Sequence, residues 1–218
     1  MIASLLPALV VTVEAAEEDW TAPLLLEEEP LVARAVEKRR REFTAGRTCA
    51  RRALERLGWR GFPILSGPRR EPLWPPGIVG AITHCRGYCA AAVARVADVR
   101  SLGIDAELRE RLPDGVADLI CTEGERIRAA ALPGDHWETL VFSAKESIYK
   151  AWYPVAQRWL DYRDADLTFD PEGGRFSGRI LLPGAEDVFP WNPVEGRFAA
   201  SAERVFTAVT VPAGGEAG

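Results

Sequence analysis

Hydrophobic and polar positions follow strand and helix periods through the first half of the chain. Residues 5–13 are almost continuously apolar and predict a buried first strand. Residues 31–57 have a helical pattern, and we expect a break near residues 44–46, where a Thr-Ala-Gly step interrupts it. Two apolar runs, residues 78–85 and 88–96, are separated by only two residues and predict a β-hairpin.

The second half is expected to contain a short strand, two helices and further strands. The short strand covers residues 102–105, and a Thr-x-x-Glu capping box at Thr122 begins a helix that Pro133-Gly134 ends near residue 132. The longest helix is predicted at residues 137–155, where apolar residues recur on one face. Four β-type runs follow at residues 165–169, 176–182, 196–202 and 205–211.

Strands, helix and strands in each part indicate an α+β fold with two similar halves. We place the N-terminal half at residues 1–103 and the C-terminal half at residues 104–212, and we expect a disordered tail at residues 213–218. Residues 61–77, rich in Pro and Gly, predict a structured loop. The sequence contains no repeat that would establish a duplication.

Composition narrows the class of protein. With 47% hydrophobic residues, the 218-residue chain can build a core, and its net charge of -5 argues against a general nucleic-acid binder. The apolar N-terminal run lacks the positive charge of a secretory signal, and no run reaches the roughly 18 apolar residues of a membrane span. We therefore expect a cytoplasmic protein without a membrane partner. Its cysteines are expected to be reduced, buried thiols: Cys49, Cys85, Cys89 and Cys121.

Two carboxylates lie two positions apart in the sequence Gly-Ile-Asp-Ala-Glu. In a strand, Asp105 and Glu107 point to the same side. Two like charges this close repel each other unless a cation or a proton lies between them, and oxygen ligands suit Mg²⁺ better than zinc. Taken alone, the same spacing also fits a solvated acidic pair at a strand end.

A second group of charges lies on the predicted long helix. Glu146 and Lys150 are one turn apart, which fits either a surface ion pair or a metal ligand beside a phosphate-binding ammonium. Lys145 could supply a further phosphate contact. No P-loop or kinase-type glycine loop accompanies these residues, so a familiar nucleotide cradle is not indicated.

Basic residues are concentrated early in the chain, around the predicted helix at residues 31–57. They fit a solvated helix face or a polyphosphate clamp, because Arg binds phosphate through paired donors. RNA binding would also use such a cluster, but the aromatic residues expected between the charges are absent. His84 follows an apolar strand, where it is either structural or a phosphate ligand.

These signals occur in one order that resembles the Sfp-type 4′-phosphopantetheinyl transferases. After the Arg-rich helix come Arg-Glu-Pro-Leu-Trp-Pro (70–75), Thr-His-Cys (83–85), Gly-Ile-Asp-Ala-Glu (103–107) and Lys-Glu-Ser-Ile-Tyr-Lys-Ala-Trp (145–152). The chain is most similar to the branch that contains the enterobactin synthetase component D proteins and the actinobacterial carrier-protein activators. By motif, the resemblance covers roughly residues 36–165.

The resemblance implies a pseudo-twofold pair of α/β halves with the active site in the cleft between them. It implies Mg²⁺-dependent transfer of 4′-phosphopantetheine from coenzyme A to a serine of an acyl, aryl or peptidyl carrier protein, with release of 3′,5′-ADP. Mn²⁺ could replace Mg²⁺, and a monomer is expected. A non-catalytic coenzyme A or nucleotide-binding module is the alternative.

The resemblance also assigns roles to residues of this chain. The metal-binding acids are Asp105, Glu107 and Glu146, and Glu146 is also the general base for the carrier serine. Lys150 stabilises the pyrophosphate and the leaving nucleotide. The coenzyme A site comprises Arg39, Arg47, Arg69, Thr83, His84, Asp105, Glu146 and Lys150, with Arg51 as a weaker candidate.

Overall fold

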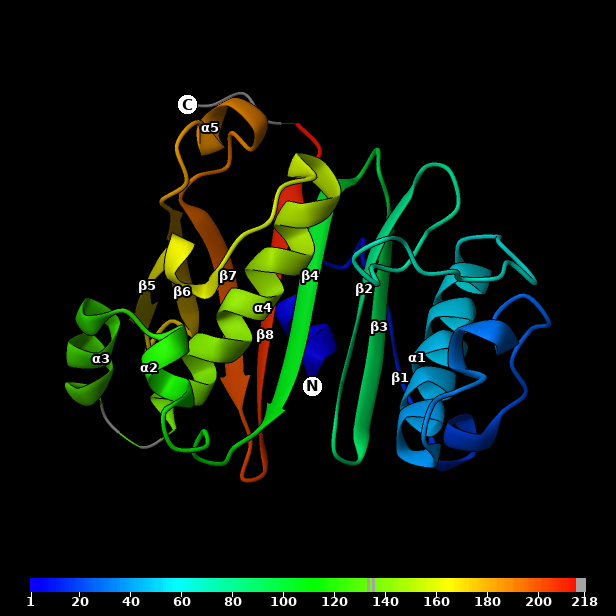
Figure 1. Ribbon diagram of the computed structural model, residues 1–218. Coiled ribbons are helices and arrows are strands. Elements are labelled where there is room, and N and C mark those ends of the chain that lie inside the picture. The colour runs from blue at the N-terminus through cyan, green and yellow to red at the C-terminus, as the bar shows by residue number, and fades with distance from the viewer. Residues whose placement is uncertain (133, 135, 215–218) are drawn as a thin grey trace.

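The computed structural model describes residues 1–132, 134 and 136–214. Two antiparallel sheets lie side by side, each with one long helix packed against it (Figure 1). The predicted α+β fold with two halves is confirmed. The predicted boundary between the halves, at residues 103 and 104, falls inside the strand Val99–Leu108. The division of the chain into two domains stays a prediction.

The first sheet has three strands in the order β1-β3-β2. These strands are β1 (Val11–Glu14), β2 (Ile78–Cys85) and β3 (Tyr88–Arg95). The β2–β3 hairpin was predicted and is confirmed. Helix α1 (Glu37–Arg56) packs on this sheet through a stripe of small and apolar residues that includes Cys49, Ala53 and Leu54.

The second sheet has five strands in the order β4-β8-β7-β6-β5. Helix α4 (Trp137–Ala156) lies across it, as Figure 1 shows, and buries Ala144, Ile148 and Ala151 against the sheet. Pro154 lies in the last turn of α4 and does not end the helix. The strands are β4 (Val99–Leu108), β5 (Ala165–Asp170), β6 (Arg175–Ile180), β7 (Val194–Ala200) and β8 (Arg204–Pro212).

Shorter elements connect these layers. The Thr122 side chain caps α3 and Glu125 completes the capping box, as predicted. The helix ends at Ala130; Pro133 and residues 215–218 of the predicted tail lie outside the described residues. The short helices are η1 (Ile2–Leu5), η2 (Glu17–Thr21), η3 (Glu29–Val32), α2 (Val116–Ile120), α3 (Glu123–Ala130), η4 (Tyr162–Asp164) and α5 (Ala185–Val188).

The two halves meet where β2 lies beside β4 (Figure 1). At this joint the Thr83 hydroxyl accepts a hydrogen bond from the Ala106 backbone N–H at 3.0 Å. On the other side of β4, Gly103 lies against α4 so closely that a Cβ atom there would be 1.9 Å from the Ser147 carbonyl oxygen. These two contacts fix the position of the central part of β4 between β2 and α4.

Two expectations about the N-terminal half were wrong. Residues 5–13 do not form one strand. Leu5 is the last residue of the short helix η1, which buries its own Ile2 and Leu5 in the core, and β1 begins only at Val11 after a turn at Pro7. Helix α1 begins at Glu37 and has no break at residues 44–46. Thr44 and Ala45 are buried, and Gly46 faces the sheet where a Cβ would be 3.0 Å from Ile82, so its small size serves packing.

Candidate active site

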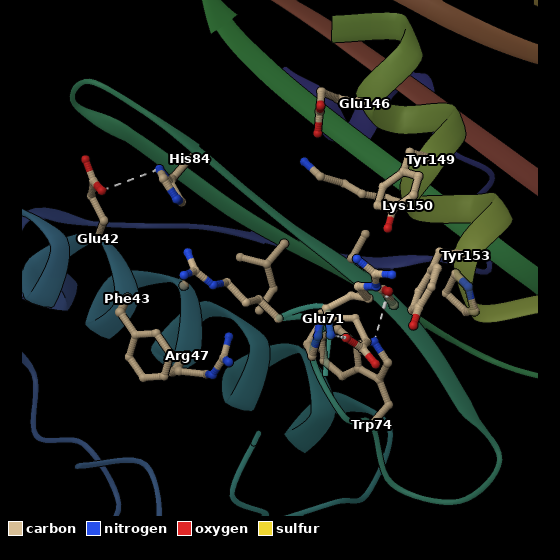
Figure 2. A pocket seen from close by; sticks show the side chains of 18 of the residues that line it. Glu42, Phe43, Arg47, Glu71, Trp74, His84, Glu146, Tyr149, Lys150 and Tyr153 are labelled. Atoms are coloured by element: carbon tan, nitrogen blue, oxygen red, sulfur yellow. Dashed lines mark hydrogen bonds and ion pairs between the residues drawn. The ribbon is translucent and has the colours of Figure 1, made fainter. Parts of the chain in front are cut away.

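A cavity of about 240 Å³ lies between α1, β2, the 61–77 loop and α4 (Figure 2). Glu146 and Lys150 project into it from α4, opposite Arg47 of α1 and His84 of β2. The lining residues that are used below are Arg39, Glu42, Phe43, Arg47, Arg69, Arg70, Trp74, His84, Glu146, Tyr149, Lys150 and Tyr153. Except for Thr83, Asp105, Glu107 and the weaker candidate Arg51, every residue predicted for the coenzyme A or metal site therefore lines one cavity.

Asp105 lies beside this cavity at the centre of β4 and is almost fully buried. Its Oδ1 accepts hydrogen bonds from Lys150 Nζ at 2.7 Å and from the Thr83 hydroxyl at 3.2 Å. Its Oδ2 is buried and has no hydrogen-bond partner among the described residues. A buried carboxylate oxygen without a partner is costly, so this atom is suited to a ligand.

Glu107 lies two residues further along β4, on the same side as Asp105. Burial, and then the negative charges of Asp105 and Glu146, raise the pKa of Glu107 to about 8, although Lys150 acts in the opposite direction. The strand periodicity therefore predicted the shared face correctly. A negative charge on Glu107 beside Asp105 and Glu146 is therefore unfavourable, and this carboxyl holds a proton at neutral pH.

Glu146 and Lys150 lie one turn apart on the face of α4 that lines the cavity (Figure 2). Glu146 Oε1 accepts a hydrogen bond from the Tyr162 hydroxyl at 2.5 Å. Lys150 Nζ also donates to the Ile104 carbonyl oxygen at 3.0 Å. Burial acts to lower the pKa of Lys150, but the charges of Asp105 and Glu146 outweigh it and raise that pKa.

The residues present fit a divalent cation. Across residues 1–132, 134 and 136–214, no group of three or more His, Cys, Asp or Glu side chains is already close enough to form a complete metal site. However, the partnerless Oδ2 of Asp105 and the mutual repulsion of the three acids indicate a place where a cation would be stabilised. Oxygen ligands of this kind suit Mg²⁺ or Mn²⁺.

A second set of contacts forms the wall that β2 and α1 contribute to the cavity. Arg39 donates to His84 Nε2 at 2.9 Å, and Glu42 lies 3.8 Å from His84 Nδ1. Burial, and the positive charges of Arg39 and Lys150, lower the pKa of His84. Accepting from Arg39 requires neutral His84 with its proton on Nδ1, facing Glu42.

Arg47 is the most deeply placed arginine of this wall. Its Nε donates to the Ile64 carbonyl oxygen at 2.7 Å and its guanidinium lies over the Phe43 ring, 4.2 Å from the centroid. Burial lowers the pKa of Arg47 to about 10, and the charges of Arg39 and Arg51 act in the same direction. A positive charge that is poorly solvated in this way is strongly stabilised by an anion.

Two predicted phosphate contacts, Arg51 and Lys145, form ion pairs outside the cavity, and Thr83 contacts Asp105 instead of a phosphate site. Arg51 forms an ion pair with the buried Glu28, which also accepts from the Ile64 N–H. The suggestion that Lys145 contacts phosphate is wrong, because its ammonium is buried in an ion pair with Glu125. The Thr83 hydroxyl is buried and bonds Asp105, so it orients a carboxylate rather than lining the cavity.

Several residues of the site were not found from the sequence. Glu42 lies one turn after Arg39, and Tyr149 lies one turn after Glu146 on α4, so helical spacing could have indicated both. Tyr162 could not be found in this way, because it contacts Glu146 from a separate turn. Trp159 contacts the Arg69 guanidinium from the loop after α4, whereas Arg70 and Trp74 belong to the motif at residues 70–75 that the sequence had already indicated.

The chain was compared with known proteins. Residues 27–94 match the model of the 4′-phosphopantetheinyl transferase N-terminal domain, and residues 101–192 match that of the 4′-phosphopantetheinyl transferase superfamily. Within the described residues, no helix is long and apolar enough to cross a membrane.

Two named transferases match over nearly the whole chain, and a more distant relative matches about two thirds of it. The 4′-phosphopantetheinyl transferase Svp of Streptomyces mobaraensis is 48% identical over 98% of this chain and 90% of its own length. The 4′-phosphopantetheinyl transferase PptT of Mycobacterium tuberculosis is 44% identical over 97% of this chain and 98% of its own length. Enterobactin synthase component D of Salmonella typhi is 37% identical over 69% of this chain and 54% of its own length. The chain therefore belongs to the 4′-phosphopantetheinyl transferase family, and the expectation that it is an enzyme of this family is confirmed.

Proposed function

We propose that this protein transfers 4′-phosphopantetheine from coenzyme A to a serine of a carrier protein, in a reaction that depends on Mg²⁺ and releases 3′,5′-ADP. The observation that carries the proposal is the placement of a buried acid with a partnerless oxygen, Asp105, next to Lys150 at the edge of an arginine-lined cavity. The near-full-length match to named transferases supports it.

Binding of coenzyme A would use the positive wall of the cavity. Arg39, Arg47 and Arg69 supply guanidinium groups for the nucleotide phosphates, and neutral His84 supplies a hydrogen bond. Arg47 gains most from an anion, because burial already reduces its hydration. This set fixes the nucleotide end, so that the pyrophosphate lies toward α4.

The acids Asp105, Glu107 and Glu146 would hold Mg²⁺ at the other end of the cavity. When bound, the ion supplies positive charge to the pyrophosphate oxygens of coenzyme A. The protein residues keep the three carboxylates at their positions although these repel one another. Mn²⁺ offers the same ligand preference and is an alternative.

Transfer needs a base for the serine hydroxyl and a positive charge for the leaving group. Glu146 accepts the serine proton, directly or through one water, as the serine oxygen forms its bond to the phosphorus atom that carries pantetheine. The bond between this phosphorus and the bridging oxygen breaks, and 3′,5′-ADP leaves with the electron pair. Lys150, whose raised pKa keeps it charged, stabilises the negative charge on the departing phosphate.

The carrier protein is the least defined partner. Acyl, aryl and peptidyl carriers of polyketide, non-ribosomal peptide and siderophore pathways all present a serine of the same chemistry. The relation to enterobactin synthase component D favours a siderophore carrier as one member of a test panel. We further propose that the protein acts in the cytoplasm as a monomer and binds neither nucleic acid nor membrane.

Mass spectrometry of carrier proteins tests the proposal. Apo carriers of the three types are incubated with the protein, coenzyme A and Mg²⁺, and one carrier is expected to gain one phosphopantetheine. Glu146→Gln should abolish the gain, whereas the matched Glu195→Gln, on an exposed position of β7, should retain it. If no carrier gains mass and calorimetry shows metal-independent coenzyme A binding, the protein is a binding module and not a transferase.

A further inference from the structure

Tyr162 is fixed to α4 through two different groups. Its hydroxyl donates to Glu146 Oε1 at 2.5 Å, and its carbonyl oxygen accepts from Lys145 Nζ at 2.7 Å. Two consecutive residues of α4 therefore hold one residue of η4, one through the side chain and one through the backbone. This arrangement ties the orientation of the Glu146 carboxylate to the position of η4.

The Lys145 anchor is rigid because the ammonium is fully engaged. Lys145 Nζ also donates to Glu125 Oε2 at 2.7 Å and to the Ile120 carbonyl oxygen at 2.9 Å, so all three of its donors have acceptors. The side chains of Lys145 and Glu125 are only 2% and 0% exposed. The other oxygen of Glu125 accepts from the Leu167 N–H at 2.8 Å. A buried and fully satisfied network of this kind allows little movement.

The Tyr162 ring has a separate support. It packs against Phe142, with 5.7 Å between ring centroids. A tyrosine hydroxyl keeps its proton at neutral pH, so the Tyr162 hydroxyl is the donor in its hydrogen bond to Glu146. Removing the hydroxyl would leave the ring and the backbone where they are, so its contribution can be measured by itself.

We propose that Tyr162 is a positioning residue that holds Glu146 Oε1 and so leaves Oε2 for the metal and the serine proton. The inference rests on the proposed function and goes beyond it, because Tyr162 lies outside the acidic motifs. Glu146 Oε1 is held by the Tyr162 hydroxyl at 2.5 Å, and free rotation of the side chain would take the carboxylate away from the other two acids. The hydrogen bond from Tyr162 opposes this rotation before any cation arrives.

Tyr162→Phe tests the proposal, with Tyr88→Phe as the matched control. Tyr88 is also partly buried and its ring also packs on a phenylalanine, Phe206, but it lies outside the cavity. A hydrogen bond to a charged group corresponds to a rate effect of about 10-fold or more. We expect kcat of Tyr162→Phe to fall by about that factor with KM for coenzyme A unchanged, and Tyr88→Phe to keep the original kcat.

Binding of Mn²⁺ alone, followed by electron paramagnetic resonance of the free ion, gives a readout independent of transfer. Tyr162→Phe should bind Mn²⁺ several-fold more weakly, at an unchanged melting temperature, and Tyr88→Phe should not. Unchanged kcat and Mn²⁺ affinity in Tyr162→Phe, or a raised KM with unchanged kcat, would overturn the proposal. If the unmodified protein transfers nothing to any carrier, the proposed function fails, and the Mn²⁺ measurement still decides whether Tyr162 positions Glu146.

Discussion

Gly103 allows β4 and α4 to approach each other at the centre of the candidate site, and replacing it should separate the acids. A Cβ at this position would be 1.9 Å from the Ser147 carbonyl oxygen and 2.9 Å from the Ala151 nitrogen. Both atoms are backbone, so no rotamer change can make room. Ordinary contact begins at 3.4 Å, and Gly103→Ala therefore requires α4 and β4 to move apart by about 1.5 Å.

This movement has two measurable consequences. Forcing a side chain into a packed interface costs about 1–3 kcal/mol, which corresponds to a melting temperature lower by about 2–12 °C in a domain of this size. Glu146 is carried by α4 and Asp105 by β4, so the distance between them should also change. A misplacement of about 1 Å can reduce a rate by about 100-fold, and we expect a loss of that order in carrier modification.

Gly178→Ala is the matched control. It lies on β6 and also faces α4, but its added Cβ would meet the side-chain ends of Ile148 and Leu167, at 2.5 and 2.8 Å. Because these ends can rotate away, Gly178→Ala should lower the melting temperature without moving the α4 backbone. Thermal melts and carrier mass spectrometry measure both effects. If Gly103→Ala modifies carrier as fast as Gly178→Ala, the close β4–α4 approach does not position the acids.

Three further substitutions probe the contacts around the acids. Lys150→Met should stop transfer yet tighten Mn²⁺ binding, because it frees Asp105 Oδ1; weaker Mn²⁺ binding would contradict this. Thr83→Val keeps the shape but leaves the buried Ala106 N–H without its acceptor, so unfolding by denaturant should show a loss of about 1–3 kcal/mol; no loss would exclude this role. Because the pKa of His84 is lowered in the folded protein, the neutral imidazole stabilises the fold above about pH 6.5, and this stability is lost as pH falls below that value. Thermal melts of His84→Gln between pH 5 and 8 should lack this pH dependence.

Local spacing was sufficient to predict some features of the site. A spacing of two residues in a strand places Asp105 and Glu107 on one side of β4. A spacing of four residues in a helix places Glu146 and Lys150 on one face of α4. Spacing could not show that Lys145, next to Glu146, points into the core. Its partners are on α2, α3 and η4, and only the tertiary fold brings these segments to it.

The fold was predictable where an element is defined by its own pattern. The β2–β3 hairpin and the α3 capping box are local and were found. The failures arose where an apolar or small residue serves a distant surface. Thr-Ala-Gly at residues 44–46 resembles a helix break, but all three residues are buried and Gly46 packs on the sheet. Ile2 and Leu5 are apolar because η1 packs them into a buried cluster with residues such as Leu102 and Phe206.

Two of the three acids of the candidate site are held by residues that are not acids. Thr83 bonds Asp105 from β2, and Tyr162 bonds Glu146 from η4. Such restraints are needed because three carboxylates repel one another before a cation is present, and the repulsion would otherwise be relieved by rotation of their side chains. Lys150 forms an ion pair with Asp105, but the pKa of Glu107 is still raised to about 8, so this carboxyl holds a proton at neutral pH. In the proposed function, the fold would contribute to metal binding by keeping the ligands together, and a divalent cation would take the place of the proton on Glu107.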